Sequence, residues 1–246
     1  MDRITRKELK SDKFAQEVSH TFRFLSEHPA EVKKYGAIAA AVLVLAGGLF
    51  FYFRYQESAR RAALEHALNL DDASVGPQQN PVLGQANFPT QADKDKAIKE
   101  AFLNLSSKYH GSQEGAIATL YMGGVAADQG NLAEAEKFYK DAADSAPAAY
   151  ASVAKMSLAQ IYASEGKTAD AEKLLRGLID KPTVFVSKEE ATIVLGQLLV
   201  HSNPQEARKL LEPLRGSRTA VSSKAIATLG LIPAASQGST QPPQNN

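Results

Sequence analysis

The chain has 246 residues, of which 44% are hydrophobic, and its formal net charge is +1. Such a charge gives no global field that would attract nucleic acid, so no nucleic-acid partner is expected. The absence of cysteine excludes disulfides, thiolate metal sites and the lipid-modified cysteine of a bacterial lipoprotein.

Residues 1–34 form a charged tail with eight Lys or Arg and six Asp or Glu. Within it, Phe14, Val18, Phe22 and Leu25 recur at helical spacing and predict a short amphipathic helix. Two interpretations stay open: the helix lies on the cytoplasmic face of a membrane, or it docks a cytoplasmic or membrane partner. Pro29 ends this helix and can open the next one at its first position.

Residues 35–53, YGAIAAAVLVLAGGLFFYF, are 19 residues without a charge. As a helix they are about 28 Å long, close to the thickness of a bilayer's hydrocarbon core. A buried core helix is disfavoured because the segment has no polar face, and a cleaved signal peptide is disfavoured because no small-residue cleavage site follows promptly. We therefore expect a single transmembrane helix that stays in place as a signal anchor. The basic residues of the tail predict a cytoplasmic N-terminus and a C-terminal domain on the outer side of the membrane.

Residues 54–115 predict an eroded helical hairpin. The membrane helix is expected to continue through QESARRAALEHALNL and to act as its first helix. The second helix is expected within TQADKDKAIKEAFLNLSSKY, where Thr90 and Asp93 form a start signal. Residues 71–89 between them read as a turn-rich loop.

A repeated motif follows. GNLAEAEKFY at 130–139 returns as GKTADAEKLL at 166–175 and as SNPQEARKLL at 202–211, which is a step of 36 residues. An apolar helix precedes each copy, so each repeat is a helix, a short turn and a helix. Within a domain of residues 54–231, we expect repeats at about 116–151, 152–187 and 188–217 and an end-capping helix at 218–231. A disordered tail is expected at 232–246.

The second helix of each repeat carries an apolar stripe at positions i, i+4 and i+7. Its members are Ala135, Tyr139, Ala142, Ala171, Leu175, Leu178, Ala207, Leu211 and Leu214. Start signals for three helices are Asn131 with Glu134, Ser187 with Glu190, and Asn203 with Pro204 and Glu206. A hairpin cannot bury its own apolar face, so neighbouring hairpins must stack. The sequence therefore predicts an all-α fold: one transmembrane helix followed by an α-solenoid.

No catalytic site is evident. The five histidines are scattered without metal-ligand spacing, so no metal site is expected. Ser152 and Lys155 match a Ser-x-x-Lys pattern, but the further motifs that give it meaning are missing. We expect a protein that is not an enzyme and binds no cofactor.

The repeats resemble the tetratricopeptide repeat. The matching residues are Gly123, Ala126, Gly130, Ala135, Tyr139, Ala142, Pro147, Ala159, Tyr162, Gly166, Ala171, Leu175, Pro182, Leu195, Leu198, Ala207 and Leu211. The resemblance implies a concave, apolar and shallow face, lined by the first helices and suited to an extended or helical peptide. By family position it is lined by Ile117, Leu120, Gly124, Val153, Met156, Gln160, Thr192 and Gly196. In a competing interpretation, the chain's own N-terminal helices fill this groove.

The succession of a short tail, one membrane helix and a tetratricopeptide domain resembles the bacterial ancillary Sec translocon subunit family, over roughly residues 30–231. This resemblance implies a bitopic protein in the lipid bilayer of a bacterial inner membrane, with its C-terminal domain in the periplasm. Its expected partners are translocon subunits, periplasmic chaperones or emerging polypeptides. The alternative function is that of a scaffold coordinating cell division or outer-membrane assembly in the envelope.

Overall fold

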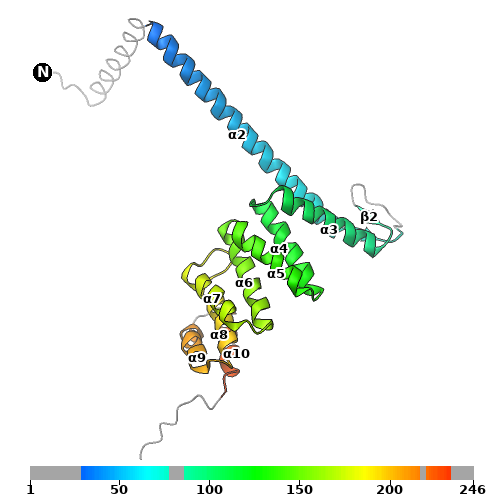
Figure 1. Cartoon of the computed structure of the whole chain (residues 1–246), viewed down its shortest axis with the longest axis vertical. Coiled ribbons are helices and arrows are strands. Elements are labelled where there is room, and N and C mark those ends of the chain that lie inside the picture. The colour runs from blue at the N-terminus through cyan, green and yellow to red at the C-terminus, as the bar shows by residue number, and fades with distance from the viewer. Residues whose placement is uncertain (1–28, 78–85, 217–219, 234–246) are drawn as a thin grey trace, which may run out of the picture. The chain divides into compact units, whose positions relative to one another are not determined.

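The computed structural model describes residues 29–77, 86–216 and 220–233 (Figure 1). The amphipathic helix expected before Pro29 lies outside these residues, as does nearly all of the tail expected to be disordered. The chain divides into two units, residues 1–59 and residues 60–246. The described elements are α2 (Pro29–Asp71), β1 (Ser74–Val75), β2 (Asn87–Phe88), α3 (Gln91–Lys108), α4 (Gln113–Asp128), α5 (Leu132–Ser145), α6 (Ala148–Ser164), α7 (Thr168–Asp180), α8 (Lys188–Leu199), α9 (Pro204–Leu211), the 3-10 helix η1 (Glu212–Gly216) and α10 (Ala220–Gly230).

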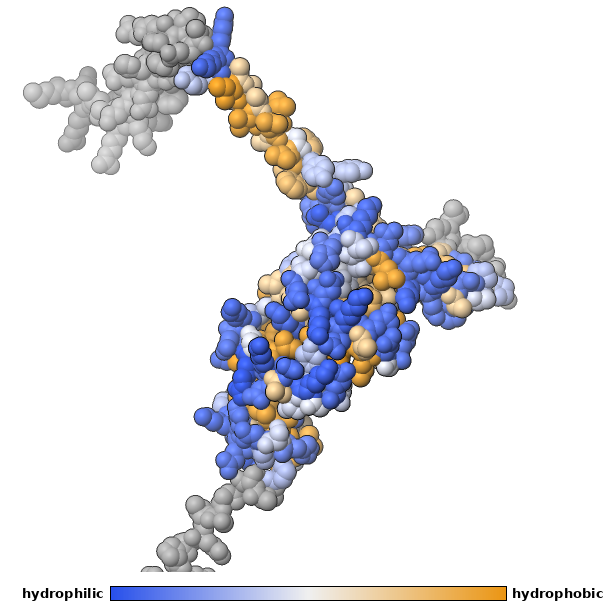
Figure 2. Space-filling model, in the orientation of Figure 1, coloured by the Kyte–Doolittle hydropathy of each residue, from blue (hydrophilic) through white to orange (hydrophobic). Residues whose placement is uncertain are grey.

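Helix α2 is described from Pro29 onward and ends at Asp71. Its apolar side chains between Tyr35 and Phe53 are exposed, and Leu43, Val44 and Phe51 each keep more than 70% of their surface accessible. Figure 2 shows this part of α2 as a hydrophobic surface. Among the described residues, α2 is the one helix that is long and apolar enough to span a membrane.

The second unit consists of helical hairpins that follow one another along the chain (Figure 1). Helices α5, α7 and α9 begin at Leu132, Thr168 and Pro204, which confirms the step of 36 residues for the second helices. The first helices are less regular, because α4, α6 and α8 begin at Gln113, Ala148 and Lys188. The connection between α7 and α8 is longer than the connection between α5 and α6, and its additional residues account for the later start of α8.

The predicted start signals are confirmed as side-chain caps. The side chains of Thr90, Asn131, Ser187 and Asn203 each accept a hydrogen bond from the backbone N–H three residues later. Each cap supplies a partner for one of the N–H groups that a helix leaves unpaired in its first turn. Helices α3, α5, α8 and α9 therefore start where local sequence dictates.

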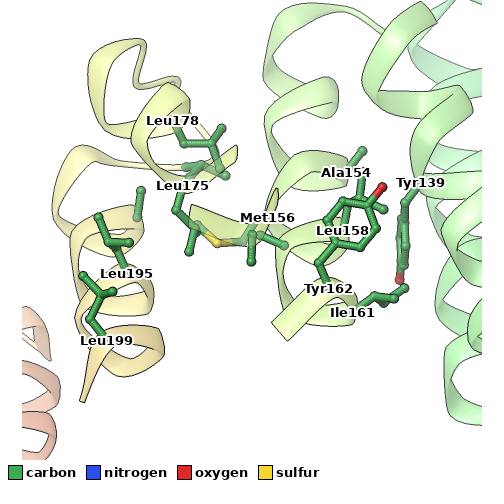
Figure 3. Close-up of a cluster of buried hydrophobic side chains, with 14 of the residues drawn as sticks. Tyr139, Ala154, Met156, Leu158, Ile161, Tyr162, Leu175, Leu178, Leu195 and Leu199 are labelled. Atoms are coloured by element: carbon green, nitrogen blue, oxygen red, sulfur yellow. The ribbon is translucent and has the colours of Figure 1, made fainter. Parts of the chain in front are cut away.

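The predicted apolar stripe lies in the core. Eight of its nine members are buried, and the ninth, Leu214, is half-buried in η1 because α9 ends at Leu211. A continuous cluster of buried side chains joins α4 to α9, and Figure 3 shows its members from Tyr139 of α5 to Leu199 of α8. A second cluster joins Ala67 of α2 with Phe102 of α3 and Met122 of α4. The fold is thus all-α, with a tetratricopeptide-like packing of the helices.

The eroded hairpin predicted at the front of the domain consists of the end of α2 and α3. Residues 71–89, expected to be a loop, also contain the two-residue parallel strands β1 and β2. Ser74 pairs with Asn87 in this ladder, and the Ser74 hydroxyl also donates to the Asn87 side-chain oxygen at 3.0 Å. Sequence reading missed these strands because two residues are too few to show a period.

Candidate protein-binding surface

The expected concave face begins on α4. Ile117, Leu120 and Gly124 are all half-buried there. Leu120 packs against the main hydrophobic cluster, and a side chain at Gly124 would begin 3.9 Å from the Tyr139 hydroxyl. Helix α4 therefore offers a partly accessible apolar surface.

The three expected residues on α6 differ in accessibility. Gln160 is exposed, and Val153 is half-buried and packs against the main cluster. Met156 keeps only 9% of its surface, and Figure 3 shows its side chain pointing toward Leu175 of α7. Val153 and Gln160 can meet a partner, whereas Met156 mainly holds the hairpin together.

The structure places both expected residues of α8 inside the domain. Thr192 keeps 7% of its surface, and its hydroxyl donates to the Lys188 carbonyl at 2.7 Å. Gly196 is buried, and a Cβ built on it would lie 2.8 Å from three side-chain carbons of Leu211. The same relation joins Gly123 to Tyr139, where the nearest distance is 2.7 Å.

This comparison shows that α8 is shifted by one residue against the 36-residue step. Gly123 precedes its contact residue by 16 positions, whereas Gly196 precedes Leu211 by 15. In α8, residues other than Thr192 and Gly196 are therefore accessible: Glu190 and Gln197 are exposed, and Val194 is half-buried. The sequence does carry a signal for this shift, namely Gly196. This small residue corresponds to Gly123 but lies one position later than two steps of 36 residues predict.

Polar contacts fasten neighbouring hairpins to each other. Glu136 of α5 accepts hydrogen bonds from Lys140 at 2.5 Å and from the Tyr162 hydroxyl of α6 at 3.2 Å. The Lys140 bond lowers the pKa of Glu136 below its ordinary value. Arg176 of α7 bonds Glu172 at 2.6 Å and Glu206 of α9 at 2.5 Å. Adjacent helices are therefore connected by charges as well as by packing.

A second set of contacts holds the end of α2 to the repeats. The Tyr121 hydroxyl of α4 donates to Asp71 at 2.9 Å, and its ring stacks on Phe102 of α3 with centroids 3.9 Å apart. Burial, aided by the bond to Asp71, raises the pKa of Tyr121 to about 12. Arg60 lies 3.2 Å from the buried carboxylate of Glu114. These contacts fix the end of α2 to α4 and pack α4 against α3.

The second unit contains hollows between its helices. A hollow of about 700 Å³ lies between α6 and α7, one of about 500 Å³ between α2 and α3, and one of about 460 Å³ beside α2, α3 and α4. None of the eight residues expected on the concave face lines any of them. The hollows are therefore separate from the expected concave face.

The residues considered for chemistry have structural contacts. The Ser152 hydroxyl donates to the Ala149 carbonyl at 2.6 Å and lies 2.7 Å from the Thr183 hydroxyl. His110 forms a pair with Asp141 at 3.0 Å. In residues 29–77, 86–216 and 220–233, no group of three or more His, Asp or Glu is arranged to hold a metal ion.

Comparison with known proteins agrees with this architecture. The model of the family described as a tetratricopeptide repeat-like domain matches residues 32–231, which is most of the chain. No curated protein and no solved structure matches it. The matched range begins within α2 and ends just after α10, so it takes in the apolar helix as well as the hairpins. The chain belongs to the tetratricopeptide repeat-like domain family.

Proposed function

We propose that this protein is a membrane-anchored scaffold for protein–protein interaction that serves the Sec translocon and the periplasmic chaperone network. Tetratricopeptide domains bind protein partners and are typically non-catalytic. The observation that carries the proposal is α2, because a single helix from Pro29 to Asp71 contains both the exposed apolar segment and the first helix of the repeat domain. A scaffold built in this way works at a membrane surface.

The proposed topology has a cytoplasmic N-terminus and a periplasmic C-terminal domain in a bacterial inner membrane. The eight basic residues among the first 34 support it. Alkaline phosphatase fused after Ile232 should be active in a bacterial host, because this enzyme folds only where disulfides form. Activity from a cytoplasmic reporter at the same site, with an inactive phosphatase fusion, would reverse the orientation.

The proposed partner-binding surface is the concave face. Ile117, Leu120 and Val153 contribute accessible apolar surface, and Gln160 is exposed beside them on α6. A partly apolar, shallow surface suits an extended or helical segment of another protein. A photo-crosslinking side chain at Gln160 tests this without disturbing the core, and Lys137 on α5 is an exposed control site. Capture of partners from Lys137 alone would contradict the assignment.

Copurification from a mild detergent tests the cellular role. Recovery of translocon subunits or periplasmic chaperones, crosslinked from Gln160, is the expected result. Recovery of division or outer-membrane assembly proteins in their place would favour the alternative of an envelope coordinator. Crosslinks only to the chain's own N-terminal helices would mean that the groove is filled from within, and the scaffold proposal would then lose its binding face.

A further inference from the structure

The hollow of about 700 Å³ lies on the other side of α6 from the proposed concave surface. Ala151, Lys155 and Tyr162 line it, at positions i, i+4 and i+11 of one helix face. At 3.6 residues per turn, Val153 and Gln160 point to the opposite side of the helix. The hollow is therefore a second surface, separate from the concave one, and its volume falls within the range of about 300–1,000 Å³ for ligand-binding pockets.

The charges around this hollow are unbalanced. Lys155, Lys173 and Lys181 line it, together with Asp170 and Asp180. Within the described part of the chain, none of the three lysines forms an ion pair. Asp170 lies in the first turn of α7, where the helix N-terminus already stabilises a negative charge. The lysines are thus available to carboxylates from outside.

Lys155 is unusual in its own helix. It is the one charged residue among the 17 residues of α6, and it is half-buried. A lysine in an otherwise uncharged helix, without a carboxylate partner in the described chain, is not explained by the packing of the fold. A bound carboxylate in the hollow would explain it.

Gly177 provides an independent observation. It lies inside α7, where glycine is the least favourable residue after proline, and it lines the hollow. Its φ is not positive, and a Cβ built on it would meet nothing within 4 Å. Gly123 and Gly196 are different, because a neighbouring side chain requires each of them to be glycine. Nothing inside the described chain requires glycine at position 177, whereas a backbone passing close over α7 would.

Much of the remaining lining is apolar, and Ser152 and Thr183 are its uncharged polar members. Leu158, Leu174 and Leu178 line the hollow together with Pro182, and Val184, two residues after Pro182, keeps 88% of its surface exposed. An apolar lining beside free lysines fits a ligand with both apolar and acidic side chains.

We propose that the hollow between α6 and α7 binds an extended polypeptide segment that carries acidic side chains. Its backbone crosses α7 at Gly177, its carboxylates face Lys155 and Lys173, and its apolar side chains cover Leu174 and Leu178. The proposal extends the proposed function, protein binding, to a second surface.

The test uses the full-length chain in detergent micelles and a fluorescein-labelled octapeptide with three glutamates separated by alanine and leucine. A matched peptide has glutamine in place of each glutamate. Anisotropy should show tighter binding of the glutamate peptide. Lys155→Gln with Lys173→Gln should weaken that binding about fivefold and leave the glutamine peptide unchanged, since each partly exposed ion pair contributes modestly. Lys137→Gln with Lys209→Gln makes the same change of charge at exposed sites elsewhere, and binding should remain.

Gly177→Ala separates binding from folding. This variant should raise Tm, because alanine favours the helix, and it should weaken binding of both peptides, because its methyl group occupies the crossing point. Unchanged peptide binding by Gly177→Ala, or equal binding of the two peptides by the unmodified protein, would overturn the proposal. It would also fail if phosphatidylglycerol in the micelles abolished peptide binding by the unmodified chain, since the lysines would then serve a lipid surface. Purified protein and synthetic peptides make the result independent of crosslinking at Gln160, so this proposal and the concave-face proposal can fail separately.

Discussion

Gly196→Ala tests the one-residue shift of α8. A methyl group at this position would lie 2.8 Å from three side-chain carbons of Leu211, where ordinary carbon contacts are about 3.5–4.0 Å. Leu211 is fully buried and belongs to a cluster with Ile193 and Ala225, so it cannot turn away without displacing them. The substitution therefore overfills the interface between α8 and α9.

The magnitude follows from two opposing effects. Overfilling a packed core costs about 1–3 kcal/mol, and replacing glycine by alanine inside a helix returns about 1 kcal/mol. Gly177→Ala receives the same helix contribution without a clash, because its methyl group meets nothing within 4 Å. The difference between the two variants isolates the overfilling, and we expect Gly196→Ala to be less stable by about 1–3 kcal/mol.

Thermal unfolding of the full chain, followed by circular dichroism at the helical band, measures this difference. For a domain of this size, 1 kcal/mol corresponds to about 2–4 °C in Tm, so Gly196→Ala should melt at least about 2 °C below Gly177→Ala. Truncating Leu211 to alanine should reduce the penalty of Gly196→Ala, since the two sites are in contact. Equal melting temperatures for the two glycine variants would refute the reasoning, because they would show that α8 does not turn Gly196 toward Leu211.

Other predictions concern buried groups in the second unit. Ala171 is fully buried, so Ala171→Arg should lower the free energy of unfolding by about 3 kcal/mol, whereas Ala169→Arg at an exposed position should be nearly silent; equal effects in thermal melts would contradict the assigned face. Glu114→Gln removes the charge facing a partly buried arginine and should cost about 1–3 kcal/mol, while Glu65→Gln on the exposed side of α2 should leave Tm unchanged; equal Tm values would show that the ion pair contributes nothing. The pKa of Tyr121 is raised from 10.0 to about 12, so its contribution to stability is complete below pH 10 and is lost as the pH rises toward 12. Tyr121→Phe should flatten that alkaline loss and remove one tyrosine ionising near pH 12 from the absorbance titration at 295 nm, and an unchanged titration would contradict the shift.

Much of the fold could be predicted because it depends on interactions between residues close in sequence. A helix cap joins a side chain to the backbone three residues away, so Thr90, Asn131, Ser187 and Asn203 were readable as start signals. The apolar stripe of the second helices has the period of a single helix, and the motif repeats at a constant step. The apolar segment of α2 was equally plain, because its length and composition alone make it able to span a membrane.

The binding surfaces could not be predicted in the same way, because they depend on contacts between helices. The resemblance to the tetratricopeptide repeat implied that Met156, Thr192 and Gly196 line the concave face, but whether each can meet a partner depends on how deeply it packs against the next helix. The step holds for the second helices, which carry the motif, and shifts by one residue in α8 because Leu211 needs a glycine opposite it.

The hollow between α6 and α7 is likewise a property of two helices at a given separation. The sequence by itself determined the helices, the starts of α3, α5, α8 and α9, the apolar faces of the second helices and an apolar segment long enough to span a membrane. Tertiary structure alone decided which side of each first helix remains accessible and that Lys155, Lys173 and Gly177 share one cavity. The physical reason is that helix formation follows from local hydrogen bonds and side-chain period, whereas accessibility is set by the side chains that a neighbouring helix brings into contact.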